Sequence, residues 1–162
     1  MATAGTLEVT TPSDREIVMT RVFNAPRRLV FDAWTKPELI KRWLGLRNGW
    51  TMVVCEVDLK VGGAYRYVWR GPSGDMGMGG VYRELVRPER VVCTEKFDEA
   101  WYTGEAIDTL VLVEEQAKTT VTTTVRYVSR EVRDAVIKSG MASGVAESYD
   151  TLDQLLASGF AS

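Results

Sequence analysis

Residues 118–158 read KTTVTTTVRYVSREVRDAVIKSGMASGVAESYDTLDQLLAS, and the hydrophobic period changes within this stretch. Residues 118–128 are mostly threonine and valine, which favours a β-strand. From Ser129 onward, apolar residues recur every three to five positions, which predicts one amphipathic helix ending near Ser158, about 45 Å long at about 1.5 Å per residue. Ser129 is typical of a helix N-cap. The apolar stripe of this helix comprises Val132, Val136, Met141, Val145, Tyr149, Leu152 and Leu156.

Upstream of this helix, strand-forming runs are separated by turn residues. Residues 15–24 form a predicted first strand, and Pro26 and Pro37 each begin a predicted short helix. The other predicted strands are 51–59, 64–70, 80–86, 90–97, 106–114 and 118–128, with a Gly-rich turn at 71–79. A long amphipathic helix that follows an antiparallel meander buries its stripe against the sheet. We therefore predict an α+β fold in which a curved antiparallel sheet wraps around the C-terminal helix.

The domain organisation follows from the same pattern. Repeats and low-complexity linkers are absent from the sequence, so residues 15–158 are predicted to form a single domain. Residues 1–14 hold few apolar side chains and are predicted to be a flexible tail. This N-terminal segment lacks the basic and apolar regions of a signal peptide, and no apolar run approaches the roughly 18 residues of a membrane helix. We therefore expect a cytoplasmic protein.

Composition excludes several classes of function. The 162 residues include 20 basic and 22 acidic side chains, so the basic surface that binds nucleic acid or an anionic membrane is not expected. The chain has no histidine, which removes Ser-His and Cys-His nucleophile pairs and histidine zinc sites. Cys55 and Cys93 lie on predicted strands three spacings apart, too far for a disulfide, so we expect free thiols. We expect no cofactor, no metal and no catalytic residue.

Four segments together resemble a known family. They are RVFNAPRRLVFDAWTKPELIKRWLG (21–45), CEVDLKVGGAYRYVWRGPSG (55–74), GGVYRELVRPERVVCTEKF (79–97) and GMASGVAESYDTLDQLL (140–156). In this order they resemble the START-like (SRPBCC) superfamily, and within it the family named after the activator of heat shock protein 90 ATPase (AHSA-like). The resemblance extends from Arg15 to Ala157 and implies a helix-grip fold. The family commonly has Trp where this chain has Val145, and the smaller side chain leaves more room beside the helix.

Aromatic residues are the main candidates for a ligand-binding site. Tyr65, Tyr67 and Trp69 alternate along one strand and share a face, which is compatible with a cavity lining or with core packing. The remaining candidates are Trp43 near a chain reversal, Trp101 in a loop, Met141 and Val145 on the long helix, and Glu84 on a strand. The resemblance implies that Glu84 points inward. Simple alternation, with Val81 and Leu85 on the opposite face, indicates instead that Glu84 points to solvent.

Three functions are compatible with these residues. A sheet that grips a helix favours a non-enzymatic binder of a small apolar or aromatic molecule, held in a cavity between the two. The resemblance also implies a protein-interaction module like the chaperone ATPase activator, or a cyclase- or aromatase-like enzyme. In the enzyme, the acid–base candidates are Glu84, Tyr65, Tyr67 and Asp58. The expected partner is a small lipophilic molecule, and homodimer formation stays open.

Overall fold

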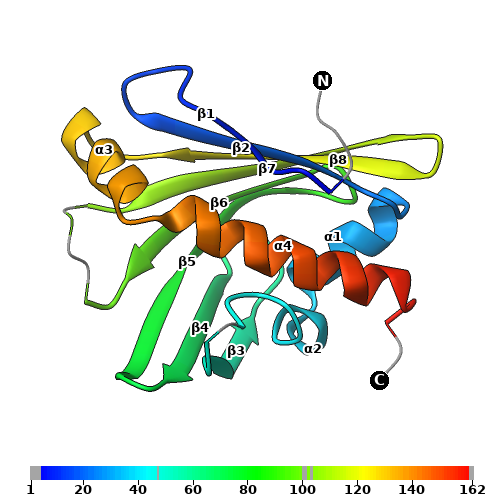
Figure 1. Cartoon of the computed structure of the whole chain (residues 1–162), viewed down its shortest axis with the longest axis horizontal. Helices are drawn as coiled ribbons and strands as arrows, with labels where there is room; N and C mark the ends of the chain where they lie inside the picture. The colour runs from blue at the N-terminus through cyan, green and yellow to red at the C-terminus, as the bar shows by residue number, and fades with distance from the viewer. Residues whose placement is uncertain (1–4, 47, 100–101, 103, 161–162) are drawn as a thin grey trace.

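The computed structural model describes residues 5–46, 48–99, 102 and 104–160. The described residues form eight strands and four helices (Figure 1). In chain order these are β1 (Glu8–Thr10), β2 (Glu16–Phe23), α1 (Arg27–Thr35), α2 (Pro37–Ile40), β3 (Thr51–Val57), β4 (Ala64–Gly71), β5 (Gly74–Val86), β6 (Arg90–Phe97), β7 (Ala106–Glu115), β8 (Lys118–Arg126), α3 (Arg130–Lys138) and α4 (Met141–Ala157).

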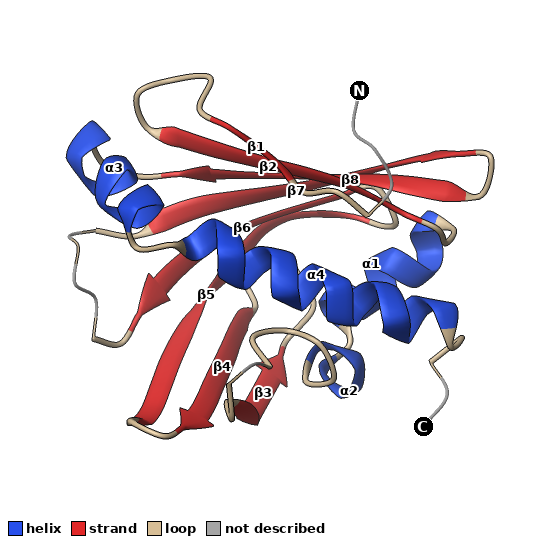
Figure 2. Ribbon diagram, viewed as in Figure 1, coloured by secondary structure: helices blue, strands red, loops and turns tan. Residues whose placement is uncertain are grey.

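All eight strands belong to one antiparallel sheet, in the order β1-β2-β8-β7-β6-β5-β4-β3. The sheet is strongly curved, so that β3 and β4 lie on one side of α4 and β2 and β8 lie on the other (Figure 2). The α4 helix crosses the concave face, and the two short helices α1 and α2 lie near its C-terminal end (Figure 1). The predicted α+β helix-grip fold is therefore confirmed.

Apolar contacts hold α4 in the curve of the sheet. Leu152 is completely buried and belongs to the same core as Phe23, Trp43 and Leu112. Burial of a leucine side chain stabilises the fold by roughly 1.5–3 kcal/mol. An ion pair adds to these contacts, because the guanidinium of the buried Arg21 on β2 lies 2.8 Å from the Asp150 carboxylate on α4.

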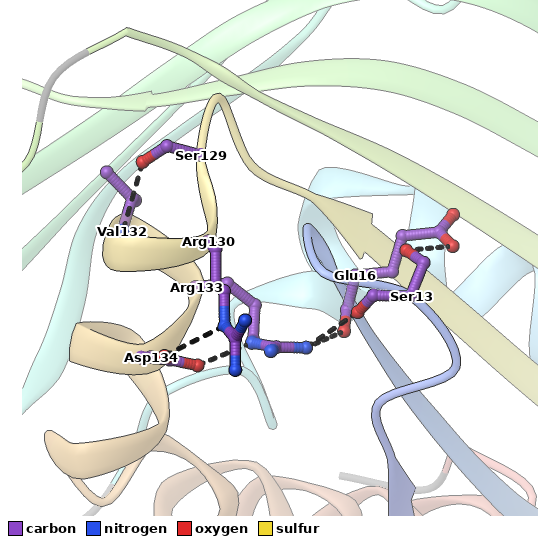
Figure 3. A network of polar contacts seen from close by, with 7 residues as sticks. All are labelled: Ser13, Glu16, Ser129, Arg130, Val132, Arg133 and Asp134. Atoms are coloured by element: carbon purple, nitrogen blue, oxygen red, sulfur yellow. Dashed lines mark hydrogen bonds and ion pairs between the residues drawn. The ribbon is translucent and has the colours of Figure 1, made fainter.

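The predicted single C-terminal helix is in fact two helices. Gly140, between α3 and α4, has a φ of +81°, a left-handed conformation that glycine adopts without a steric penalty. Hydrophobic periodicity did not reveal this break because the apolar stripe resumes immediately after it. Ser129 is the N-cap of α3, as predicted, and its hydroxyl oxygen accepts a hydrogen bond of 3.2 Å from the amide of Val132 (Figure 3).

The break allows α3 to pack against the N-terminal part of the sheet. The Arg133 guanidinium donates hydrogen bonds to the carbonyl oxygens of Ser13, at 2.7 Å, and Glu16, at 3.3 Å (Figure 3). Residues 8–10, within the segment expected to be a flexible tail, form the edge strand β1. Leu7 packs against the core as well. Part of the expected tail is thus an ordered component of the domain.

The Gly-rich stretch predicted to be a turn at 71–79 is mostly strand. The turn is confined to residues 71–74, and β5 begins at Gly74. A Cβ atom at Gly80 would overlap the carbonyl oxygen of Thr94 on β6. Glycine is therefore needed at this position for the close approach of two strands, rather than for a chain reversal.

Candidate functional site

A cavity of 530 Å³ lies between α4 and the concave face of the sheet. Its walls come from α1, the segment after α2, α4 and six strands, β2 and β4 to β8, together with the residue that follows β8. The described residues that line it are Met19, Trp34, Trp43, Leu44, Gly45, Trp50, Trp69, Met76, Glu95, Phe97, Asp108, Thr123, Val125, Tyr127, Met141, Gly144, Val145, Ser148 and Tyr149. Most of these side chains are apolar or aromatic, which is typical of a small-molecule site.

Aromatic rings in fixed orientations form one wall of the cavity. The ring of Trp34 lies edge-on to that of Trp43, with 4.7 Å between centroids, and to that of Tyr149, at 5.6 Å. The indole N–H of Trp43 donates a 2.9 Å hydrogen bond to the carbonyl of Ala33. The indole N–H of Trp69 likewise donates to the carbonyl of Leu44, at 2.9 Å. Because both donors are already paired, these two residues present ring surface to the cavity.

The first turns of α4 also line the cavity. Met141, Gly144, Val145 and Ser148 all line the cavity, and Met141 and Val145 are only partly buried. The hydroxyl oxygen of Ser148 accepts a 3.0 Å hydrogen bond from the amide of Gly45. This bond fixes α4 to the loop after α2 at the edge of the cavity.

Two carboxyl groups, Glu95 on β6 and Asp108 on β7, also line the cavity. In the strand register Asp108 is opposite Cys93 and Glu95 is opposite Ala106, so the two carboxyls are diagonal neighbours on the concave face. The two groups are close enough for each to influence the titration of the other. Burial raises the pKa of both groups, and the charge of Glu95 raises the pKa of Asp108 further.

The sequence candidates fall into three groups in the structure. Trp43, Trp69, Met141 and Val145 line the cavity. Tyr65 and Tyr67 share the buried face of β4 with Trp69, as the alternation predicted, but belong to the adjacent packed core. The Tyr65 hydroxyl donates a 2.5 Å hydrogen bond to the carbonyl of Thr94, and the Tyr65 and Tyr67 rings lie 5.1 Å apart. Trp101 lies outside the described residues.

Glu84, the remaining candidate, does not line the cavity. Its carboxylate lies 3.0 Å from the guanidinium of Arg90, and 46% of its side chain is exposed. A bulge between Tyr82 and Glu84 shifts the alternation, so that Val81 is 41% exposed while Leu85 packs against the core. The premise that Val81 and Leu85 share a face was therefore wrong, although the inference that Glu84 points to solvent was correct.

The carboxyl pair was not identified from the sequence, although a signal was present. Val91, Cys93 and Glu95 alternate on β6, and Ala106, Asp108 and Leu110 alternate on β7. A carboxylate in the inward register of a strand is unusual unless it has a function or a partner. Only the pairing of β6 with β7 shows that these two inward carboxylates are neighbours.

A second hollow, of 390 Å³, lies at the surface near the ends of β6 and β7. It is lined partly by Arg27, Glu89 and Glu114. The Arg27 guanidinium lies 3.7 Å from the Glu89 carboxylate, and the Arg27 amide donates a 2.7 Å hydrogen bond to Glu114. Because its charged groups already pair with one another, this hollow is a weaker candidate than the cavity under α4.

Neither a metal site nor a membrane-spanning helix is found among the described residues. Within the described ranges, no three His, Cys, Asp or Glu side chains are grouped so as to hold a metal ion. None of the helices in these ranges is long and apolar enough to cross a membrane. Cys55 and Cys93 are free thiols, as expected. Burial raises the pKa of Cys55 to about 11, so its thiol is protonated at neutral pH.

A curved sheet, a gripped helix and a cavity between them define the class of START-like helix-grip domains. The family model described as Activator of Hsp90 ATPase homolog 1-like protein matches residues 24–157, and the chain belongs to this family.

Solved structures agree with this assignment. A protein from Rhodobacter sphaeroides is 34% identical, with a TM-score of 0.87, and the match covers 93% of this chain and 98% of that one. A protein from Chromobacterium violaceum is 28% identical, with a TM-score of 0.77 and coverages of 88% and 97%. An HSP90 activator from Plasmodium falciparum shares the fold, at 23% identity and a TM-score of 0.54 over 69% of this chain and 72% of that one. No curated protein sequence matches the chain.

Proposed function

We propose that this protein binds a small apolar or aromatic molecule, without chemical change, in the cavity between the sheet and α4. The cavity itself is the observation that carries the proposal. Its volume of 530 Å³ falls within the range of about 300–1,000 Å³ that is typical of small-molecule sites. The paired indole N–H groups of Trp43 and Trp69 leave aromatic surface as the main contact for a bound molecule.

The enzyme alternative loses the acid–base residues on which it was based. Glu84 is paired with Arg90, and the Tyr65 hydroxyl is bonded to the carbonyl of Thr94. Asp58 is an exposed turn residue whose carboxylate lies 3.7 Å from the Lys60 ammonium. None of these groups lines the cavity. Their contacts therefore contribute to the structure and do not reach a molecule bound there.

Titration with N-phenyl-1-naphthylamine, a neutral apolar dye that fluoresces when bound, tests the proposal. We expect saturable binding of about one dye per chain. Val145→Trp places an indole in the cavity and should abolish dye binding while the protein stays folded. Val61→Trp is the matched control, because Val61 is 65% exposed in the β3–β4 turn and its replacement should leave dye binding unchanged.

A second candidate is a protein-interaction module, which the family match and the structural similarity to an HSP90 activator favour. This candidate predicts no dye binding, and it predicts that Val145→Trp overpacks the interior and destabilises the fold by about 1–3 kcal/mol. The ATPase rate of an Hsp90, measured with and without this protein, tests it directly. Stimulation of that rate together with absence of dye binding would replace the small-molecule proposal.

A further inference from the structure

The charges that line the cavity are of one sign. Glu95 and Asp108 are the only charged residues among the described residues of its lining, and neither Lys nor Arg accompanies them. The rest of the lining is apolar or aromatic, apart from the hydroxyl groups of Thr123, Ser148 and the tyrosines. A ligand with a negative charge would therefore meet like charges in an environment of low dielectric constant, where such repulsion is strong.

One oxygen of the carboxyl pair lacks a hydrogen-bond donor. The Oδ1 atom of Asp108 is buried and has no hydrogen-bond partner among the described residues. Buried carboxylate oxygens normally accept hydrogen bonds, because an unsatisfied buried acceptor costs about 1–3 kcal/mol. This oxygen of Asp108 is therefore an acceptor that the described residues leave open to a donor from a bound molecule.

The aromatic wall is suited to a cation as well as to an apolar body. Trp34, Trp43 and Trp69 line the cavity together with Tyr127 and Tyr149. The faces of such rings attract an ammonium group placed within about 6 Å, and tryptophan does so most strongly. A cation in this cavity would thus find ring faces beside it and carboxylates to neutralise its charge.

We propose that the bound molecule is a lipophilic amine, whose protonated nitrogen donates hydrogen bonds to Glu95 and Asp108 while its apolar or aromatic body lies between α4 and the tryptophan rings. This inference rests on the proposed function and adds to it the chemical class of the ligand. The ammonium group supplies a positive charge beside the two carboxyls and a donor for the unpaired oxygen of Asp108. Desolvation of the ammonium is offset because it is paired and hydrogen-bonded in the site.

Three compounds with one ring system test the inference: 1-naphthylmethylamine, 1-naphthylmethanol and 1-naphthoic acid. At pH 7 they are a cation, a neutral alcohol and an anion. Isothermal titration calorimetry of the whole protein with each compound should give the tightest binding for the amine, by about tenfold or more over the alcohol. The carboxylate should bind most weakly.

Variants assign the preference to the carboxyl pair. Glu95→Gln and Asp108→Asn should each weaken amine binding by about tenfold and change alcohol binding by less than about threefold. Glu105→Gln is the matched control, because this carboxylate is 51% exposed at the surface and faces Arg83 at 3.9 Å. The control should bind all three compounds like the wild type.

The outcomes separate this inference from the proposed function. If the alcohol binds as tightly as the amine to the wild type, the ligand class is wrong while the small-molecule function stands. If none of the three compounds binds, both fail. An amine preference that persists undiminished in both carboxyl variants would show that the pair does not recognise the ammonium. The wild-type series decides the ligand class even if a variant does not fold.

Discussion

The two halves of α4 face the same sheet but differ in how completely they pack. In the C-terminal half, Leu152 is 0% exposed and Leu155 and Leu156 are also buried. In the N-terminal half, Met141 and Val145 are partly buried and line a 530 Å³ cavity. One amphipathic helix thus packs closely against the sheet at its C-terminal end and borders a cavity at its N-terminal end. This space is where we propose that a small molecule binds.

The largest expected effect comes from shortening a leucine in the packed half. Leu152→Ala should lower the free energy of unfolding by about 2–5 kcal/mol, because the buried side chain leaves a void that the core cannot fill. The matched change in the other half, Val145→Ala, should cost about 1 kcal/mol or less, because it enlarges an existing cavity. Urea unfolding of both variants measures the difference. Equal losses would mean that the two halves pack equally well.

Removing one of the two cavity carboxyls should change how stability depends on pH. Asp108 and Glu95 have a raised pKa in the folded state, so their contribution to stability is complete below the unfolded-state pKa of about 4 and is lost as the pH rises. Because the asparagine amide does not ionise, Asp108→Asn removes the part of this stability loss that comes from Asp108. The variant should match the wild type at pH 4 and be more stable by about 1–3 kcal/mol at pH 8, the usual cost of an unsatisfied buried polar group.

Urea unfolding at a series of pH values measures this effect. Five other titratable groups interact electrostatically with Asp108: Cys93, Tyr65, Tyr102, Tyr127 and Tyr149. Burial raises the pKa of each of them, so none titrates between pH 4 and 8. Glu105→Gln, which removes an exposed carboxylate, serves as the control and should run parallel to the wild type. A stability difference for Asp108→Asn that does not vary with pH would contradict the assignment.

A smaller effect is expected at the junction of the two C-terminal helices. Gly140→Ala forces a side chain into a left-handed conformation at φ +81° and should destabilise the fold by about 1 kcal/mol, although the surrounding space is open. Gly159→Ala, with φ +66° and equally open surroundings after α4, is the comparison. If a continuous helix formed instead, Gly140→Ala would stabilise the protein.

The smallest effect is expected at the N-terminal edge of the sheet. Deletion of residues 1–10 removes β1 and the contact of Leu7 with the core, so the melting temperature should fall by a few degrees. Thermal unfolding followed by circular dichroism measures this change. An unchanged melting temperature for the longer deletion would return residues 5–10 to the flexible tail that the sequence predicted.

The features that the sequence determined are local and periodic. The change of period near Ser129 located the last strand and the start of the helical region, because burial of one face imposes a period of two on a strand and 3.6 on a helix. Alternation correctly placed Tyr65, Tyr67 and Trp69 on one buried face. The order of elements was sufficient for the helix-grip fold, since a helix with one apolar stripe has only the sheet against which to bury it.

Tertiary structure decided the features that depend on distance between strands. Tyr67 and Trp69 share a face, yet Trp69 lines the cavity while Tyr67 is packed in the core. Glu95 and Asp108 become neighbours through the register of β6 with β7, which neither strand encodes alone. The left-handed turn at Gly140 ends α3 without interrupting the apolar stripe. Periodicity reports which side of an element is buried, whereas the packing of several elements determines what that side contacts.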